Sequence, residues 1–486
     1  MSHPIATPRG EETNRWLVLV LVCIAQFMVI LDATIVNVAL PSIQADLDFS
    51  QGDLQWVINS YTLVFGGFLL LGGRMGDLLG RRRLFMVGLA VFAISSLLCG
   101  LAVSSGMLIA MRLLQGAAGA ILSPSVFSIV LVTFREGAER NKALGILGAI
   151  AGSGAAIGVL LGGVLTEYVG WEWIFFVNVP IGLGALALVP RYVAESKAHD
   201  LAHHFDAAGA VTITAGLMLF VYGLTETTNV GWTAWQTLLS FAGFAILLVA
   251  FLVIESRSHS PLVPLGFFRR RTLAGANLIG FGLGTTIFGM FFLLSLYMQI
   301  VLGYSALETG VGYLAVALTA VVASGVAQAL VTRLGVKPVL AAGMALLGIG
   351  LVLFTQVSVD GSYVADLLPG FLLVGVGLGF SFVPVSIAAL AGVAGKEAGL
   401  ASGLINTSQQ IGGALGLAIL TTVSTTRTDN LTPAGEQPSL ASLVDGYSIA
   451  FWVAAGFAAI SLLITFLILK REDLASAPEA AEAPAS

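Results

Sequence analysis

Charged residues are scarce in this sequence. Asp, Glu, Lys and Arg make up 10% of the 486 residues, whereas soluble domains carry about 25%. Apolar residues amount to 57%, and the mean hydropathy is +0.95. A soluble globule of this size needs more charge on its surface than the chain holds. The composition therefore excludes most soluble enzyme classes and indicates an integral membrane protein.

Cysteine, histidine and excess positive charge are also scarce or missing. Cys23 and Cys99 lie inside apolar runs, which favours small buried side chains over a disulfide or a metal pair. The five histidines fall outside those runs, which argues against a haem within the membrane. A net charge of −5 provides no basic face for nucleic acid. We expect no metal, no cofactor and no nucleic-acid partner.

Long apolar runs are abundant. A membrane-spanning helix needs roughly 20 apolar residues, and we count fourteen suitable runs. The first follows Arg15, is too long for a signal peptide and is interpreted as a retained helix. The runs lie at about 16–40, 54–73, 84–104, 107–132, 143–166, 173–190, 208–225, 237–254, 273–301, 310–331, 338–356, 365–390, 401–423 and 447–469.

The positions of Lys and Arg predict the orientation. With both termini in the cytoplasm, all but two of the 22 basic residues fall in the cytoplasmic tails and loops. The exceptions are Arg112, inside a run, and Arg427. Adding or removing one helix would disrupt this partition. We therefore predict an all-α protein with 14 transmembrane helices and both termini cytoplasmic.

A weak internal repeat indicates how the helices are grouped. Gly119 precedes Pro124 by five positions, as Gly379 precedes Pro384. Two parallel six-helix repeats are typical of transporters with a site at the interface of the repeats. The predicted parts are a cytoplasmic tail (1–15), an N-terminal six-helix half (16–190), a linker with two extra helices (191–272), a C-terminal six-helix half (273–469) and a disordered cytoplasmic tail (470–486).

Asp32 and Arg112 are the two charges that we expect deep in the membrane. The neighbours of Asp32 one turn away on its own helix are all apolar, so nothing there pairs with the carboxylate. Helix geometry places Asp32 roughly 12 Å and Arg112 roughly 8 Å below the same outer face. Such residues are functional by default, although a surface-reaching carboxylate or a purely structural ion pair remains an alternative. If their helices are neighbours, the two can pair and exchange partners as a proton arrives and leaves.

Glycines mark two further features. Gly73 and Gly80 flank Asp77 in a loop with Arg81, which we interpret as a cytoplasmic latch in place of an ordinary basic loop. Gly148, Gly152, Gly154, Gly158 and Gly162 form a small-residue ridge that suits helix packing and sliding. Gly375-x-Gly377-x-Gly379 lies inside an apolar run with no strand before it, which favours packing over nucleotide binding.

These segments resemble the major facilitator superfamily, specifically its fourteen-helix drug:proton antiporters of the multidrug efflux type. The matching segments are Leu31 to Pro41, Gly73 to Arg83, Arg112 to Gly116, Gly154 to Gly163, Trp171 to Pro180 and Gly399 to Asn406. Leu78 replaces a usual basic residue, Val159 stands where proline is typical, and Glu172 stands where arginine is common.

The resemblance implies a fold and roles for several residues. It implies the major facilitator fold, with two six-helix halves and two extra central helices. Asp32 would couple transport to protons, and Arg112 would tune the proton transfer. Asp77 and Arg81 would form the cytoplasmic gate. The glycines from Gly154 to Gly163 would form the antiporter motif.

The function that we predict is proton-driven export of small amphipathic compounds, such as antibiotics, across the cell membrane. The chain is expected to be a transporter and not an enzyme, and to act as a monomer. Alternatives are a dedicated exporter of one metabolite or self-made antibiotic, an uptake symporter, and a non-transporting sensor or scaffold. Aromatic and neutral polar residues from both halves would line the substrate cavity: Trp56, Asn59, Tyr61, Phe292, Tyr297, Asn406 and Gln410.

Overall fold

The described part of the chain is almost entirely helical. A computed structural model of the protein describes residues 15–50, 52–134, 138–196, 206–258, 261, 266, 269–391, 398–433 and 436–469. Within these ranges there is no β-strand, and the predicted all-α class is confirmed.

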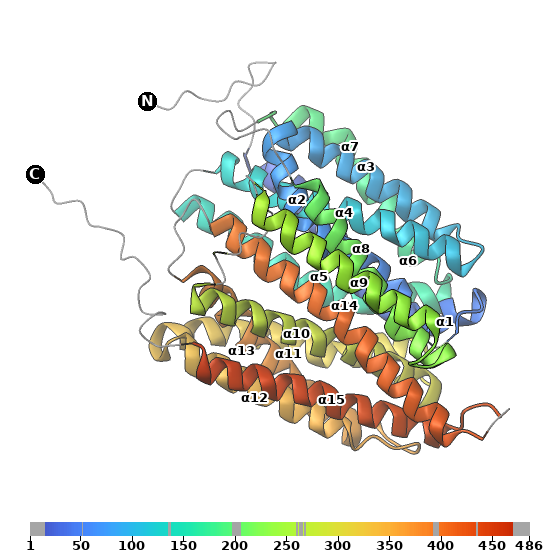
Figure 1. Cartoon of the computed structure of the whole chain (residues 1–486). Helices are drawn as coiled ribbons and strands as arrows, with labels where there is room; N and C mark the ends of the chain where they lie inside the picture. Colours follow the sequence, from blue (N-terminus) through green and yellow to red (C-terminus); the bar gives the residue numbers. More distant parts are fainter. Residues whose placement is uncertain are drawn as a thin grey trace, which may run out of the picture. The chain divides into compact units, whose positions relative to one another are not determined.

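Figure 1 shows the helices. In chain order they are α1 (Arg15–Asp46), α2 (Trp56–Leu79), α3 (Arg81–Gly100), α4 (Ser105–Thr133), α5 (Ala138–Tyr168), α6 (Trp173–Phe176), α7 (Asn178–Tyr192), α8 (Ala207–Val230), α9 (Trp235–Arg257), α10 (Arg271–Leu296), η2 (Tyr297–Val301), α11 (Ala306–Leu334), α12 (Val336–Phe354), η3 (Tyr363–Leu367), α13 (Leu368–Leu390), α14 (Ala398–Leu431) and α15 (Leu440–Leu467).

Every predicted apolar run coincides with one of these helices or with a continuous helical segment. Among the described residues, 12 segments are long and apolar enough to cross a membrane. The two remaining runs, 143–166 and 401–423, lie within α5 and α14. The count of fourteen spans and the cytoplasmic side of both termini stay predictions.

Lipid offers no water to bond the backbone N–H and C=O groups. Helices satisfy these groups because each N–H bonds a carbonyl of the same helix. Several helix starts are capped by a side chain that accepts a bond from the first turn. Ser104 accepts from Met107 N at 3.3 Å before α4, and Asp206 accepts from Gly209 N at 2.6 Å before α8. These caps fix where the helices begin.

The chain divides into two compact units. The first contains α1 to α9 together with Leu294–Leu314. Within it, α1 packs against α4, α5 and α7, and α3 packs against α4 and α7. The extra helices α8 and α9 pack against each other, and α8 also packs against α2. Buried apolar side chains fill the space between these helices, among them Val22, Met28, Phe85, Phe92 and Val126.

The second unit contains the rest of α10 and α11 together with α12 to α15. Here α12 packs against α13 and α15, and α12 and α15 lie side by side in Figure 1. A Cβ at Gly377 would lie 2.6 Å from the Leu347 nitrogen, and one at Gly379 would lie 2.6 Å from the Ser324 nitrogen. These glycines therefore serve close helix packing, as the sequence indicates. The predicted boundaries of the two six-helix halves stay predictions.

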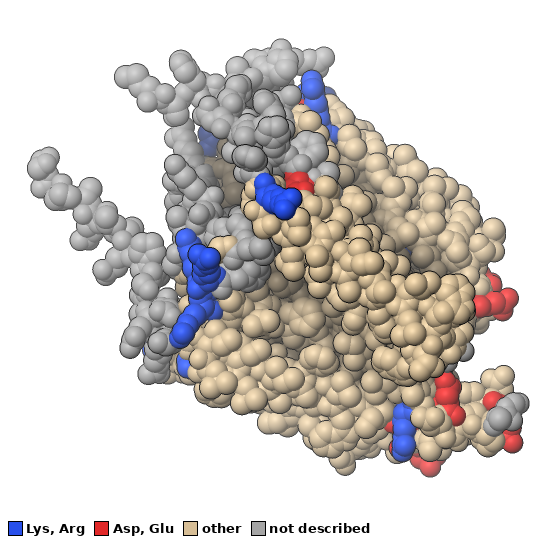
Figure 2. Space-filling view, viewed as in Figure 1, with Lys and Arg blue, Asp and Glu red and all other residues tan. Residues whose placement is uncertain are grey.

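The surface of the helices suits contact with lipid. On the face shown in Figure 2, uncharged residues cover most of the visible surface. On α9, the side chains of Leu238, Ile246 and Val249 are all exposed. Such a surface would be a liability in water, and it is the expected one for a helix that faces acyl chains.

Candidate functional site

Asp32 and Arg112 form a fully buried ion pair in the first unit. Asp32 lies on α1 and Arg112 on α4, and the Arg112 Nη1 lies 2.6 Å from the Asp32 Oδ2. The side chains are 0% and 1% exposed. The structure thus brings together the two charges that the sequence singles out, and it places neither at the protein surface.

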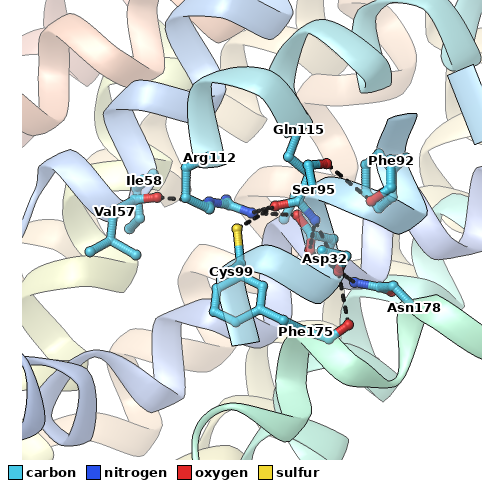
Figure 3. Close-up of polar contacts among 12 residues, drawn as sticks. Asp32, Val57, Ile58, Phe92, Ser95, Cys99, Arg112, Gln115, Phe175 and Asn178 are labelled. Atoms are coloured by element: carbon cyan, nitrogen blue, oxygen red, sulfur yellow. Dashed lines mark hydrogen bonds and ion pairs between the residues drawn. The ribbon is translucent and has the colours of Figure 1, made fainter. Parts of the chain in front are cut away.

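Two amides complete the surroundings of the Asp32 carboxylate (Figure 3). Gln115 Nε2 on α4 donates to the Asp32 Oδ1 at 2.7 Å, and Asn178 Nδ2 on α7 donates to the same oxygen at 3.0 Å. With Arg112, the carboxylate accepts bonds from three side chains. A buried charge is tolerated only when it is paired and hydrogen-bonded in this way.

The Arg112 guanidinium also has several hydrogen-bond and aromatic contacts. Its Nε donates to the carbonyl oxygen of Val57 on α2 at 3.0 Å, and its Nη1 donates to the Gln115 Oε1 at 2.8 Å. The centre of its guanidinium group lies 4.4 Å from the ring centre of Tyr61 and 5.7 Å from that of Phe175. These contacts fix a planar cation whose donors match a carboxylate.

Ser96 and Cys99 on α3 extend the network. The Ser96 Oγ accepts from Gln115 Nε2 at 3.3 Å and from Asn178 Nδ2 at 3.1 Å. It donates to the carbonyl oxygen of Phe175 at 2.8 Å. The Cys99 thiol lies 3.6 Å from the Gln115 Oε1. Side chains from α1, α3, α4 and α7 therefore meet at one polar cluster inside an apolar core.

Small residues explain why these helices approach so closely. A Cβ at Gly116 would overlap the backbone of Tyr61, so glycine allows α4 to contact α2 next to Arg112. A Cβ at Gly162 would lie 2.7 Å from the Ile35 carbonyl oxygen, and one at Gly158 would collide with the Thr34 side chain. The glycines of α5 thus form the surface on which the Asp32 segment of α1 rests.

Gly154 and Gly163 are the other two glycines of the predicted antiporter motif. A Cβ at Gly154 would lie 3.1 Å from the Ile30 Cγ2 on α1. A Cβ at Gly163 would instead lie 2.8 Å from the Ala306 carbonyl oxygen at the start of α11. The glycines of this motif therefore contact two partners within the first unit.

The segment between α2 and α3 is held by a carboxylate that the sequence does not indicate. Glu195, after α7, accepts hydrogen bonds from the backbone nitrogens of Arg82 at 3.1 Å and Arg83 at 3.2 Å. Its Oε2 also lies 3.8 and 3.7 Å from the Nε atoms of Arg82 and Arg83. The backbone N–H of Arg81 donates to the Ser196 carbonyl oxygen at 3.1 Å. An acid thus caps the positive end of α3.

The predicted latch residues lie around this contact. Gly80 has a φ of +113°, and a Cβ there would lie 2.7 Å from the Glu195 Oε1. A Cβ at Gly73 would lie 3.4 Å from the Pro124 Cβ, which is an ordinary contact. The side chain of Asp77 lies outside what the structure describes.

The predicted substrate contacts fall into different surroundings. Tyr61 belongs to the polar cluster, and Asn59 donates to the Gln55 Oε1 at 3.2 Å. The side chains of Phe292 and Tyr297 are buried, those of Trp56 and Gln410 are half-buried, and that of Asn406 is exposed. That these residues share one cavity stays a prediction.

Comparison with known proteins identifies the family. Residues 22–417 match the sequence model of the Major Facilitator Superfamily. The chain belongs to this superfamily. The predicted family is thereby confirmed, and the protein is a multi-pass transporter of the cell membrane. In the part of the chain that the structure describes, no group of His, Cys, Asp and Glu residues is placed to hold a metal.

Two relatives are similar to the chain over most of its length. The puromycin resistance protein pur8 of Streptomyces alboniger is 39% identical over 467 residues, covering 95% of this chain and 92% of the relative. The cephamycin export protein CmcT of Amycolatopsis lactamdurans is 40% identical over 452 residues, covering 92% and 91%. A solved peptide transporter, POT in complex with sulfate, has a TM-score of 0.67 at 15% identity and covers 95% of each chain. This last likeness concerns the fold alone.

Proposed function

We propose that this transporter is a proton-coupled exporter that moves small amphipathic compounds out of the cell by alternating access. The observation that carries the proposal is the buried Asp32–Arg112 pair with its amide donors. An ionisable pair inside a membrane protein is costly, and such pairs mark proton and ion pathways. The names of pur8 and CmcT, which refer to resistance and export, support the outward direction.

The geometry suits a pair that changes partners on protonation. When Asp32 is ionised, its carboxylate neutralises the Arg112 guanidinium. When Asp32 takes up a proton, Arg112 loses this anion but keeps the carbonyl of Val57 and the Oε1 of Gln115. The guanidinium is then a positive charge without a counter-ion in a low-dielectric site. Protonation would therefore favour a state in which this charge reaches other groups or water.

The direction of coupling follows from the membrane potential. In the proposed cycle, Asp32 is ionised while substrate enters from the cytoplasm, and a proton from outside promotes release and return. An inside-negative membrane potential of 100 mV contributes about 2.3 kcal/mol for each net positive charge that moves inward. The predicted latch with Asp77 and Arg81, next to the contacts of Glu195 with Arg82 and Arg83, would open and close the cytoplasmic side during this cycle.

A narrower function is the second candidate. The names of pur8 and CmcT each refer to one antibiotic or antibiotic class, which favours a dedicated exporter of a single compound. A panel of unlabelled antibiotics and dyes separates the two candidates in a vesicle competition assay. A broad exporter is inhibited by many unrelated amphipathic compounds, whereas a dedicated exporter is inhibited by one and its close analogues.

The test of the proposed function is transport by the purified protein in proteoliposomes. An imposed pH gradient should drive accumulation of puromycin or of a lipophilic monocationic dye, and collapse of the gradient by an ionophore should abolish it. Accumulation that persists without any proton gradient or membrane potential would contradict proton coupling. The absence of transport across the panel would contradict the exporter assignment.

A further inference from the structure

Asn178 differs from every other group that contacts Asp32. It is the first residue of α7, and its side chain is fully buried. Its Nδ2 is shared between the Asp32 Oδ1 at 3.0 Å and the Ser96 Oγ at 3.1 Å. Its Oδ1 is buried and has no hydrogen-bond partner among the described residues. A buried acceptor without a donor is unfavourable and calls for an explanation.

Gln115 provides the comparison. It also donates to the Asp32 Oδ1, but its own Oε1 accepts from the Arg112 Nη1 at 2.8 Å and faces the Cys99 thiol at 3.6 Å. Rotating this amide by half a turn would place an NH₂ group against the guanidinium. Gln115 is therefore fixed in one orientation. Asn178 has no such partner behind it, so its amide is the one that can rotate.

We propose that Asn178 is a positioning residue that serves Asp32 in both of its protonation states. With Asp32 ionised, the Nδ2 of Asn178 donates to the carboxylate, as observed. With Asp32 protonated on its Oδ1, the amide of Asn178 rotates by half a turn, and its Oδ1 accepts the hydrogen bond from the new O–H group. This inference rests on the proposed function, in which Asp32 takes up and releases the coupled proton.

The neighbours of Asn178 permit this rotation. The Ser96 hydroxyl both donates and accepts, so it can turn its hydrogen from the Phe175 carbonyl to the rotated amide oxygen. The rotated Nδ2 then occupies the place of the present Oδ1. The number of unpaired polar atoms on Asn178 is one in either orientation. Rotation therefore exchanges one buried unpaired atom for another and adds none.

The charged and titratable groups around Asp32 also influence its protonation. Among the described residues, Arg112 on α4 is the charged group that contacts the carboxylate. Cys99 on α3 and Tyr61 on α2 are the other titratable groups of the cluster, each reached through Gln115 or Arg112. Phe175 of α6 and Asn178 of α7, which contact the cluster, are not titratable. Changing Asn178 therefore leaves the charge of the site unaltered.

Replacing Asn178 should shift the pH dependence of transport to higher pH. The bond to the carboxylate is charge-assisted and about twice as strong as the bond between two neutral groups. Loss of the amide thus penalises the ionised state more than the protonated state, and Asp32 binds its proton at higher pH. We expect Asn178→Leu to move the midpoint of the pH profile upward by about one unit.

The first experiment compares the pH profiles of proton-driven substrate transport in proteoliposomes. Asn178→Leu removes both hydrogen-bonding functions at similar volume, and Asn178→Ala is the fallback if the leucine variant does not fold. Asn178→Ser keeps a short donor and acceptor and should shift the midpoint less. Asn277→Leu is the matched control, because Asn277 is a buried amide that bonds Leu273 and Ser408 in the second unit. It should leave the midpoint in place, and an unshifted midpoint in both Asn178→Leu and Asn178→Ala would overturn the proposal.

The second experiment does not depend on transport. Infrared difference spectra of the purified protein, recorded between high and low pH, report the C=O band of protonated Asp32 and the amide band of Asn178. Both bands should change at the same midpoint in the wild type, and both should be missing in Asp32→Asn. An Asp32 band without any change in the Asn178 amide would overturn the rotation. If the bands change together but no proton-driven transport occurs, the proposed function fails and the role of Asn178 stands.

Discussion

The Arg112 guanidinium donates to the Asp32 carboxylate at 2.6 Å, and the two side chains lie 80 positions apart in the chain at 1% and 0% exposure. The pair is not isolated, because Gln115 contacts both partners. Its amide nitrogen binds the acid and its amide oxygen binds the base. A change in the charge of either residue therefore changes the hydrogen bonding of the other residue and of the Gln115 amide.

Breaking this pair from one side should cost more stability than removing it altogether. Arg112→Gln leaves a buried carboxylate without its cation, which typically costs 3–5 kcal/mol. The double variant Asp32→Asn/Arg112→Gln has neither charge and should be more stable than Arg112→Gln alone. Thermal unfolding in detergent of the wild type, both single variants and the double variant measures this. Additive losses in the double variant would contradict the coupling of the two residues.

Glu195 should contribute more to stability and to the transport rate than an acid in an exposed ion pair. Its carboxylate accepts two backbone N–H bonds at the start of α3, and its side chain is 22% exposed. Glu195→Gln should lower stability by about 1 kcal/mol through the weakened cap and should slow transport. The control is Glu139→Gln, because Glu139 pairs with Arg15 at 3.3 Å and both side chains are at least 40% exposed. Exposed pairs contribute little, so equal losses in stability and rate would contradict the special role of Glu195.

Gly162 should not tolerate a side chain. A Cβ there would lie 2.7 Å from the backbone oxygen of Ile35, so Gly162→Ala forces α5 away from α1. Such overpacking typically costs 1–3 kcal/mol, and the shift reaches the helix that carries Asp32. Gly184→Ala on α7 is the control, because a Cβ at Gly184 would have nothing within 4 Å. It should be neutral or slightly stabilising, since alanine favours helix. Thermal unfolding and transport rates of the two variants should therefore diverge, and a fully active, stable Gly162→Ala protein would contradict this packing.

Dications should be poor substrates. Asp32 is an acid deep in a membrane helix, and its carboxylate is already paired with Arg112. Glu226, Asp366 and Asp445 lie near helix ends and give a second positive charge no deep partner. Cells that express the protein should therefore resist monocationic and neutral compounds about tenfold better than dications, a difference of roughly 1.4 kcal/mol. Growth inhibition with matched mono- and dicationic dyes measures this, and equal resistance would show that another acid serves the site.

The sequence predicts the membrane helices and one ion pair well, and it predicts the surroundings of that pair poorly. Apolar runs locate the helices because burial in lipid requires nearly continuous hydrophobicity. The similar depth of Asp32 and Arg112 is predicted from helix rise alone. Gln115 is in principle detectable, because it lies one turn from Arg112 on the same face.

The contacts of Asn178 and Glu195 depend on tertiary structure. Asn178 lies 146 positions from Asp32, and Glu195 lies 113 positions from Arg82. Both contacts depend on how α7 packs against α1 and α3, which local patterns do not specify. Asn178 follows the short helix α6 and Val177 inside one continuous apolar run, and hydropathy does not distinguish it from its neighbours. Asn178 does stand in the Trp171 to Pro180 segment, which carries the resemblance without indicating its role.

The most direct test of the account is proton release upon addition of substrate to inside-out vesicles, with wild type beside Asp32→Asn. Addition of a monocationic or neutral amphipathic dye should cause the wild-type protein to release protons from the vesicle interior, and Asp32→Asn should release none while remaining folded and able to bind the dye. Equal proton release by Asp32→Asn would contradict the account, because the coupling would then reside on a group other than the buried carboxylate.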